Sequence, residues 1–155
     1  MLKNISKILE GREFVSVATC DFKGRPNAAP KFLLKIENSF LYLIDYSFGH
    51  TWENLKINPR VSVSFVDTET LMGYQLNGAV DIIKNGPVYQ AICEDVIAKE
   101  IDLSAKRIIE GVSTERSHKN FEISMSEKFL VYKINIEEVV QIGTSGELKR
   151  EKIEK

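Results

Sequence analysis

Runs of residues in which apolar and polar side chains alternate make up much of this 155-residue chain. Alternation with a period of two is typical of β-strands that bury one face. Turn-forming sequences separate the runs; Asp21–Gly24, for example, ends in a glycine that can supply the positive φ of a hairpin. The six predicted strands cover residues 14–20, 27–37, 40–45, 60–67, 73–83 and 129–142.

Apolar residues at helical spacing occur in three places between these strands. Residues 2–9 predict a short amphipathic helix, which Gly11 can terminate. A second short helix begins with Thr51 as its N-cap and ends before the next proline, because proline forces the preceding residue out of the helical region. The third segment is longer and covers residues 87–111, with a point near residues 102–104 where it could break.

These elements predict one mainly β (α+β) domain at residues 1–143. We expect a six-stranded antiparallel barrel with an N-terminal helix, a short helix after strand three and a longer helical insert before the last strand. Strands and helices do not alternate regularly, which excludes a doubly wound parallel sheet, and closing the sheet into a barrel removes its exposed edges. The polar residues 112–127 predict a loop, and residues 144–155 predict a flexible polar tail.

Composition and charge narrow the classes of function. The 21 basic and 22 acidic residues are interspersed and give a net charge of −1, so the chain lacks the basic face that nucleic-acid binding requires. No apolar run is long enough to span a membrane, and the N-terminal residues lack the apolar core of a signal peptide. Cys20 and Cys93 form no CxxC motif. We therefore expect a cytoplasmic protein with neither a membrane nor a nucleic-acid partner.

The polar loop at residues 46–50 leads into the second predicted helix and forms a candidate anion site. The first amides of a helix have no intrahelical partner and lie at the positive end of its dipole, so they bind phosphate readily. Thr51 can either cap the helix or bond a phosphate oxygen, and His50 can add a donor. Lys31 and Lys35 are predicted to share one face of strand two, where they need either solvent or an anion.

Other chemistry has less support in the sequence. Neither GxGxxG nor GxxxxGK[ST] occurs, and no GxSxG motif indicates a nucleophilic serine. His118, the second histidine, has no histidine or cysteine partner at metal-ligand spacing, so we predict no metal site. Cys20 and Cys93 lie among apolar neighbours and are interpreted as small core residues. We assign no catalytic residue.

Five segments resemble, in order and spacing, the pyridoxamine 5′-phosphate oxidase-like split barrels that bind FMN. Residues 51–62 carry most of the resemblance through the pattern TxxNxxxNPxVS. The other four segments are residues 14–19, 24–30, 40–43 and 73–78, so the match covers about half of the chain.

The resemblance implies a homodimer in which each FMN lies in a groove at the subunit interface. It places one end of strand two against the flavin and the end of strand three at the pyrimidine edge of the ring. It also places the start of the short helix at the phosphate and ribityl chain. One residue of strand five is implied to lie near the ring and could come from the other subunit. The implied cofactor-binding residues are, in that order, Ala29, Pro30, Lys31 and Phe32; Ile44, Asp45 and Tyr46; His50, Thr51 and Asn54; and Gln75.

The chain also departs from true pyridoxamine-phosphate oxidases. Pro30 and Lys35 stand roughly where those enzymes carry an Arg and a Lys for the substrate phosphate, and their C-terminal Arg and Trp segment has no counterpart after Ile142. We therefore predict an FMN-binding flavoprotein, an oxidoreductase of unknown substrate, that does not oxidise pyridoxamine phosphate. Two alternatives stay open: a deazaflavin or heme cofactor on the same barrel, and a non-enzymatic flavin-binding or regulatory module.

Overall fold

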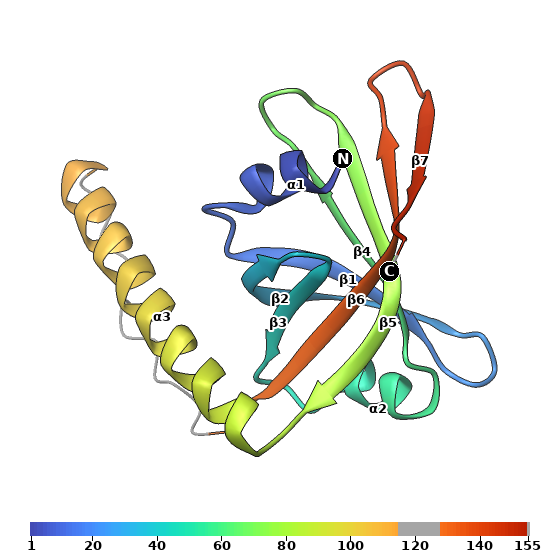
Figure 1. The fold of residues 1–155 in the computed structure, drawn as a ribbon. Coiled ribbons are helices and arrows are strands. Elements are labelled where there is room, and N and C mark those ends of the chain that lie inside the picture. Colours follow the sequence, from blue (N-terminus) through green and yellow to red (C-terminus); the bar gives the residue numbers. More distant parts are fainter. Residues whose placement is uncertain (115–127, 155) are drawn as a thin grey trace.

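Seven antiparallel strands form the centre of the molecule in the computed structural model, which describes residues 1–114 and 128–154 (Figure 1). Their order in the sheet is β3-β2-β1-β4-β5-β6-β7, and a further pairing of β3 with β6 closes the first six into a barrel. The predicted six-stranded antiparallel barrel is therefore confirmed. The strands are β1 Phe14–Cys20, β2 Pro26–Glu37, β3 Phe40–Asp45, β4 Arg60–Val66, β5 Gly73–Ile83, β6 Leu130–Ile142 and β7 Leu148–Lys152.

Three helices accompany the strands in the described residues. The helix α1 (Leu2–Leu9) buries Ile5 and Leu9 in the barrel core, α2 (His50–Ile57) connects β3 to β4, and α3 (Pro87–Thr114) connects β5 towards β6. None of the helices in the described part of the chain is long and apolar enough to cross a membrane. The predicted loop at residues 112–127 falls largely outside the described residues.

Alternating side chains fill the barrel, as the sequence pattern predicts. In β1 and β4, Val15, Val17 and Val63 point inward and are almost fully buried, while the residues between them are more exposed. Gly78 leaves no room for a side chain between β5 and β6, because a Cβ there would lie 2.1 Å from the backbone oxygen of Asn135. Closure of this barrel brings the end of β3 beside the start of β6, where Asp45 pairs with Leu130 in the ladder.

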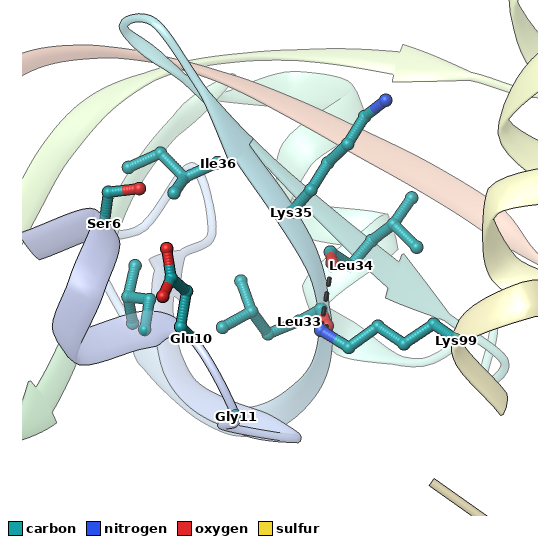
Figure 2. A pocket seen from close by; sticks show the side chains of 9 residues that line it. Ser6, Glu10, Gly11, Leu33, Leu34, Lys35, Ile36 and Lys99 are labelled. Atoms are coloured by element: carbon teal, nitrogen blue, oxygen red, sulfur yellow. Dashed lines mark hydrogen bonds between the residues drawn. The ribbon is translucent and has the colours of Figure 1, made fainter. Parts of the chain in front are cut away.

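The strand β2 breaks its own alternation at a bulge between Leu33 and Lys35. The bulge places the side chains of Lys31 and Lys35 on different sides of the strand, so the prediction that they share a face is wrong. The side chain of Lys31 is only 5% exposed, whereas that of Lys35 is 38% exposed. Lys99 of α3 donates hydrogen bonds to the carbonyl oxygens of Leu33 (2.5 Å) and Leu34 (2.9 Å) at this irregularity (Figure 2).

The helix α3 is continuous over 28 residues, so the break considered near residues 102–104 does not occur. Leu103 is buried there, together with Ile92 and Val96, in a second apolar cluster that includes Phe32 and Ile44 of the barrel wall. Packing of Leu103 thus stabilises the helical conformation at residues 102–104, where the sequence also allowed a break. Figure 1 shows α3 beginning beside the barrel and extending away from it.

The C-terminal residues differ from the flexible tail expected at residues 144–155. A turn after β6 reverses the chain, and β7 then pairs with β6 from Ile142↔Leu148 to Glu138↔Lys152. Most side chains of β7 are exposed, so the strand has no buried apolar face whose alternation would reveal it in the sequence. Pairing of its backbone with the free end of β6 explains why it forms nevertheless.

Candidate functional site

The start of α2 is the centre of the candidate site. Gly49 is the N-cap of this helix, and its carbonyl oxygen accepts a hydrogen bond from the backbone N–H of Glu53 at 3.2 Å. The predicted N-cap, Thr51, is therefore wrong by two residues. No side chain of the described residues caps the helix. Its first amides are therefore unoccupied by side-chain acceptors and carry the positive end of the helix dipole.

Two buried side chains anchor α2 to the barrel. Thr51 Oγ1 accepts a hydrogen bond from Asn27 Nδ2 at 3.1 Å, and Asn54 Nδ2 donates to Thr19 Oγ1 at 3.1 Å. Both Thr51 and Asn54 are buried. These bonds fix the helix against β1 and β2, so the direction of its first amides is set by the barrel.

A cavity of about 270 Å³ lies between the β1–β2 hairpin and α2. It brings together two of the predicted residues, His50 and Asn54. His50 is largely exposed, and its Nδ1 lies 2.8 Å from Glu53 Oε2. Arg25 is also exposed, and its Nε donates to Asp21 Oδ2 at 2.6 Å. The full lining is Asp21, Arg25, Pro26, Asn27, His50 and Asn54.

Arg25 and Asn27 were not predicted as site residues. Both lie in the segment 24–30, whose resemblance to the FMN-binding barrels was recognised, but the hairpin had to fold before either could be placed beside α2. The cavity therefore has two cationic or potentially cationic side chains, Arg25 and His50, at the dipole-positive end of a helix. It also contains the carboxylate of Asp21, which is already bonded to Arg25.

A buried polar network lies beneath the loop that precedes α2. Lys31 Nζ donates to Asp45 Oδ1 at 2.8 Å, and Tyr132 OH donates to Asp45 Oδ2 at 2.7 Å. Ser47 donates to Asp45 Oδ1 through both its backbone N–H (2.9 Å) and its hydroxyl (2.8 Å). The Asp45 side chain is only 2% exposed. The carboxylate thus joins β2, β3, β6 and the loop at one point.

Electrostatics keep this carboxylate charged. Burial by itself would raise the pKa of Asp45, but hydrogen bonds from Lys31, Tyr132 and Ser47 hold it below its ordinary value. The pKa of Tyr132 is raised, because its hydroxyl is buried and donates to the carboxylate. Tyr132 therefore remains a neutral donor and Asp45 an ionised acceptor at neutral pH.

Tyr46 links the same loop to α3. Its hydroxyl donates to Glu100 Oε1, and its ring packs edge-on against Phe129 at a centroid distance of 5.9 Å. Burial, with the neighbouring Glu100, raises the pKa of Tyr46 well above its ordinary value. Phe32 and Ile44 belong to the apolar cluster on this side of the barrel.

Two further predicted residues, Pro30 and Gln75, lie on the outer face of the sheet. Pro30 pairs with Ser16, Ser16 with Ser64, and Ser64 with Gln75, so these four residues form one row across β2, β1, β4 and β5. Ala29 pairs with the inward-facing Val17, so it lies on the opposite face of β2, where it is half-buried. At the usual strand separation, three spacings put Gln75 about 14 Å from Pro30. One chain alone therefore does not bring Gln75 to the other predicted residues.

Metal-binding groups are lacking in what the structure describes of the chain. Residues 1–114 and 128–154 contain no group of three His, Cys, Asp or Glu side chains that could hold a metal ion. His118 lies outside the described residues.

The strand order, the closure through β3 and β6 and the short helix between β3 and β4 define an antiparallel split barrel. The chain belongs to the pyridoxamine 5′-phosphate oxidase family, because the sequence model of that family matches residues 1–143. This match extends beyond the half of the chain in which the resemblance was recognised from motifs.

Individual relatives carry names that point to different cofactors. Heme oxygenase HutZ of Vibrio cholerae is 30% identical over 66 residues, which are 43% of this chain and 37% of the length of that protein. An FMN-binding protein related to pyridoxamine 5′-phosphate oxidase, from Nostoc punctiforme, has a similar structure: the TM-score is 0.60 at 15% identity, over 99% of this chain and 96% of the other. A heme binding protein from Mycobacterium smegmatis has a TM-score of 0.59 at 17% identity, over 94% of this chain and 55% of the other. At these identities the two structures indicate a shared fold alone.

Proposed function

We propose that the chain binds FMN, with the phosphate in the cavity at the start of α2. The observation that carries this proposal is the geometry of that cavity: uncapped amides of α2 next to Arg25 and His50. A phosphate dianion suits such a site, because helix amides, a guanidinium and an imidazole all donate hydrogen bonds to it. Thr51 keeps its own hydroxyl proton available while it accepts a bond from Asn27.

The cofactor would supply the redox chemistry, and the protein would bind and orient it. Arg25, His50 and the α2 amides would hold the phosphate, while the backbone at the end of β3 would border the ring. The side chains of Lys31 and Asp45 are already bonded to each other inside the barrel. We therefore assign them no direct contact with the flavin. An oxidoreductase is the function this arrangement supports best, with the substrate unassigned.

A homodimer forms part of the proposal. The outer face of the sheet, with the row from Pro30 to Gln75, also carries apolar side chains at its border: Phe14 is 53% exposed and Val66 51% exposed. Burying this face against a second copy would remove apolar surface from water and bring Gln75 of the partner towards the flavin. Light scattering coupled to size exclusion tests this, and a monomer would contradict it.

Heme is the second candidate, because HutZ and the mycobacterial neighbour are named for it. The visible spectrum of the purified protein separates the two, because bound flavin and bound heme absorb at different wavelengths and only heme gives an intense Soret band. Titration of the apoprotein with FMN and with hemin, followed by fluorescence quenching and absorbance, gives the affinities. A protein that binds hemin and leaves FMN fluorescent would overturn the flavin proposal.

A further inference from the structure

The network that the buried side chains of Lys31, Asp45 and Tyr132 form with the exposed Ser47 lies outside the cavity, yet it is connected to it. Three of its hydrogen bonds end on Ser47: Asp45 Oδ1 accepts from the backbone N–H and the hydroxyl of Ser47, and Lys31 Nζ donates to Ser47 Oγ at 3.3 Å. Ser47 is two residues before Gly49, the N-cap of α2. The network therefore holds the residue from which the chain enters the helix.

Backbone hydrogen bonds continue this connection into α2. Gly49 donates its N–H to Ser47 O at 2.8 Å, which forms a tight turn, and Gly49 O accepts from Glu53 N. The position of Ser47 thus determines the position of Gly49, and Gly49 determines where the helix begins. Displacement of Ser47 would therefore move Gly49 and the backbone that leads into the first amides of α2.

Stability gives a weak reason for burying a Lys–Asp pair. Desolvation of two charges costs about as much as their attraction returns, and apolar side chains of similar shape are often at least as stabilising. A buried charged network instead demands one geometry, because each of its donors and acceptors must find its partner. This network is satisfied in that way: Asp45 accepts from three different residues.

We propose that the Lys31–Asp45–Tyr132 network positions the loop at residues 46–49 and thereby sets the affinity of α2 for the phosphate of its ligand. This rests on the proposed binding of FMN. The three residues are positioning residues, since none of them lines the cavity. Their effect on affinity should therefore depend on the phosphate. Riboflavin has the same ring and ribityl chain without the phosphate, so the affinity for riboflavin should not change when the network is altered.

The test replaces the network by apolar side chains of similar size, in the triple variant Lys31→Met/Asp45→Leu/Tyr132→Phe. Dissociation constants for FMN and for riboflavin are measured by quenching of flavin fluorescence, with thermal unfolding as a check on the fold. We expect FMN affinity to fall about tenfold, the equivalent of roughly one charge-assisted hydrogen bond, and riboflavin affinity to stay within about twofold. The matched control is Asp95→Asn, which changes the carboxylate of the exposed pair with Lys35 and should leave both affinities as in the wild type.

A single substitution provides the same test if the triple variant does not fold. Ser47→Ala removes an exposed hydroxyl that both Lys31 and Asp45 contact, and it should weaken FMN binding about threefold while leaving riboflavin binding as it is. Unchanged FMN affinity in the folded variants, or an equal loss for FMN and riboflavin, would overturn the positioning role alone. A wild-type protein that binds no FMN, or binds it no more tightly than riboflavin, would overturn the proposed function as well.

Discussion

The two lysines of β2 look alike in the sequence, but the ion pairs that they make in the structure differ. Lys31 Nζ lies 2.8 Å from Asp45 Oδ1 inside the barrel, and Lys35 Nζ lies 2.7 Å from Asp95 Oδ2 on its surface. The distances are nearly equal, but the first pair is buried and connected to two further donors, while the second is half-exposed. The N–O distance alone therefore does not tell which pair contributes more to the free energy of unfolding. Burial and the number of connected partners do.

The difference follows from the bulge between Leu33 and Lys35. Because the bulge inserts one residue between the two lysines, the strand presents Lys31 to the barrel end and Lys35 to α3. Lys99 satisfies the two carbonyl oxygens at the bulge, and burial lowers the pKa of this lysine. A contact from α3 thus stabilises the irregularity that separates the two ion pairs.

The largest effect is expected when the buried pair loses one partner. Lys31→Met leaves the Asp45 carboxylate buried without its cation, and we expect a loss of about 3–5 kcal/mol in the free energy of unfolding. Urea unfolding followed by circular dichroism measures this. A loss below about 1 kcal/mol would mean that the pair behaves like a surface pair despite its burial.

A smaller loss is expected from Tyr132→Phe. The ring keeps its packing in the core, but Asp45 Oδ2 loses the hydrogen bond from the hydroxyl, which as a bond to a charged acceptor contributes about 1.5–3 kcal/mol. The same urea titration applies. Tyr89→Phe is a useful control, since its hydroxyl donates to a backbone carbonyl oxygen, that of Phe129, and not to a carboxylate.

Acid should weaken the buried pair. The pKa of Asp45 is lowered in the folded state, so its stabilising contribution is complete above the unfolded value of about 3.9 and is lost as the pH falls through the folded value. We expect the difference in unfolding free energy between wild type and Asp45→Asn to narrow below about pH 4. Urea unfolding of both proteins at a series of pH values measures this, and a difference that stays constant in acid would contradict the lowered pKa of Asp45.

The smallest effect is expected at the exposed pair. Lys35→Met should change the free energy of unfolding by less than about 1 kcal/mol, because solvent screens the pair with Asp95 and each side chain loses entropy in forming it. The hydrogen bond to Asp95 raises the pKa of Lys35, so this contribution is complete below the unfolded pKa and is lost only as the pH rises through the folded value. Unfolding curves at pH 7 and at low and high salt measure it.

Much of the barrel could be predicted from the sequence, because a strand with one buried face carries its own signature. The predicted bounds of β1, β3 and β5 agree with the structure. The bulge in β2 could not be predicted, since the donor that satisfies its carbonyl oxygens, Lys99, lies more than 60 residues away. The strand β7 could not be predicted either, since its formation depends on pairing with β6 and not on burial.

The candidate site likewise contains residues that could be predicted from the sequence and residues that could not. The loop and helix start, with His50 and Asn54, could be predicted as one region because they are close in the sequence. Arg25 reaches the cavity only through the β1–β2 hairpin, and Tyr132 reaches Asp45 only after β3 and β6 close the barrel. Local pattern identifies residues that act together along the chain, but it does not identify partners that are joined by long-range pairing.

The strand β7 has one further consequence, for self-association. It pairs only with β6 among the described residues, so its other edge presents backbone donors and acceptors that a strand of another molecule could bond. Four of its five residues are charged, and charged side chains on an edge strand disfavour pairing with a second copy; they are Lys149, Arg150, Glu151 and Lys152. The polar residues that kept β7 from being predicted as a strand thus also disfavour aggregation through an open sheet edge.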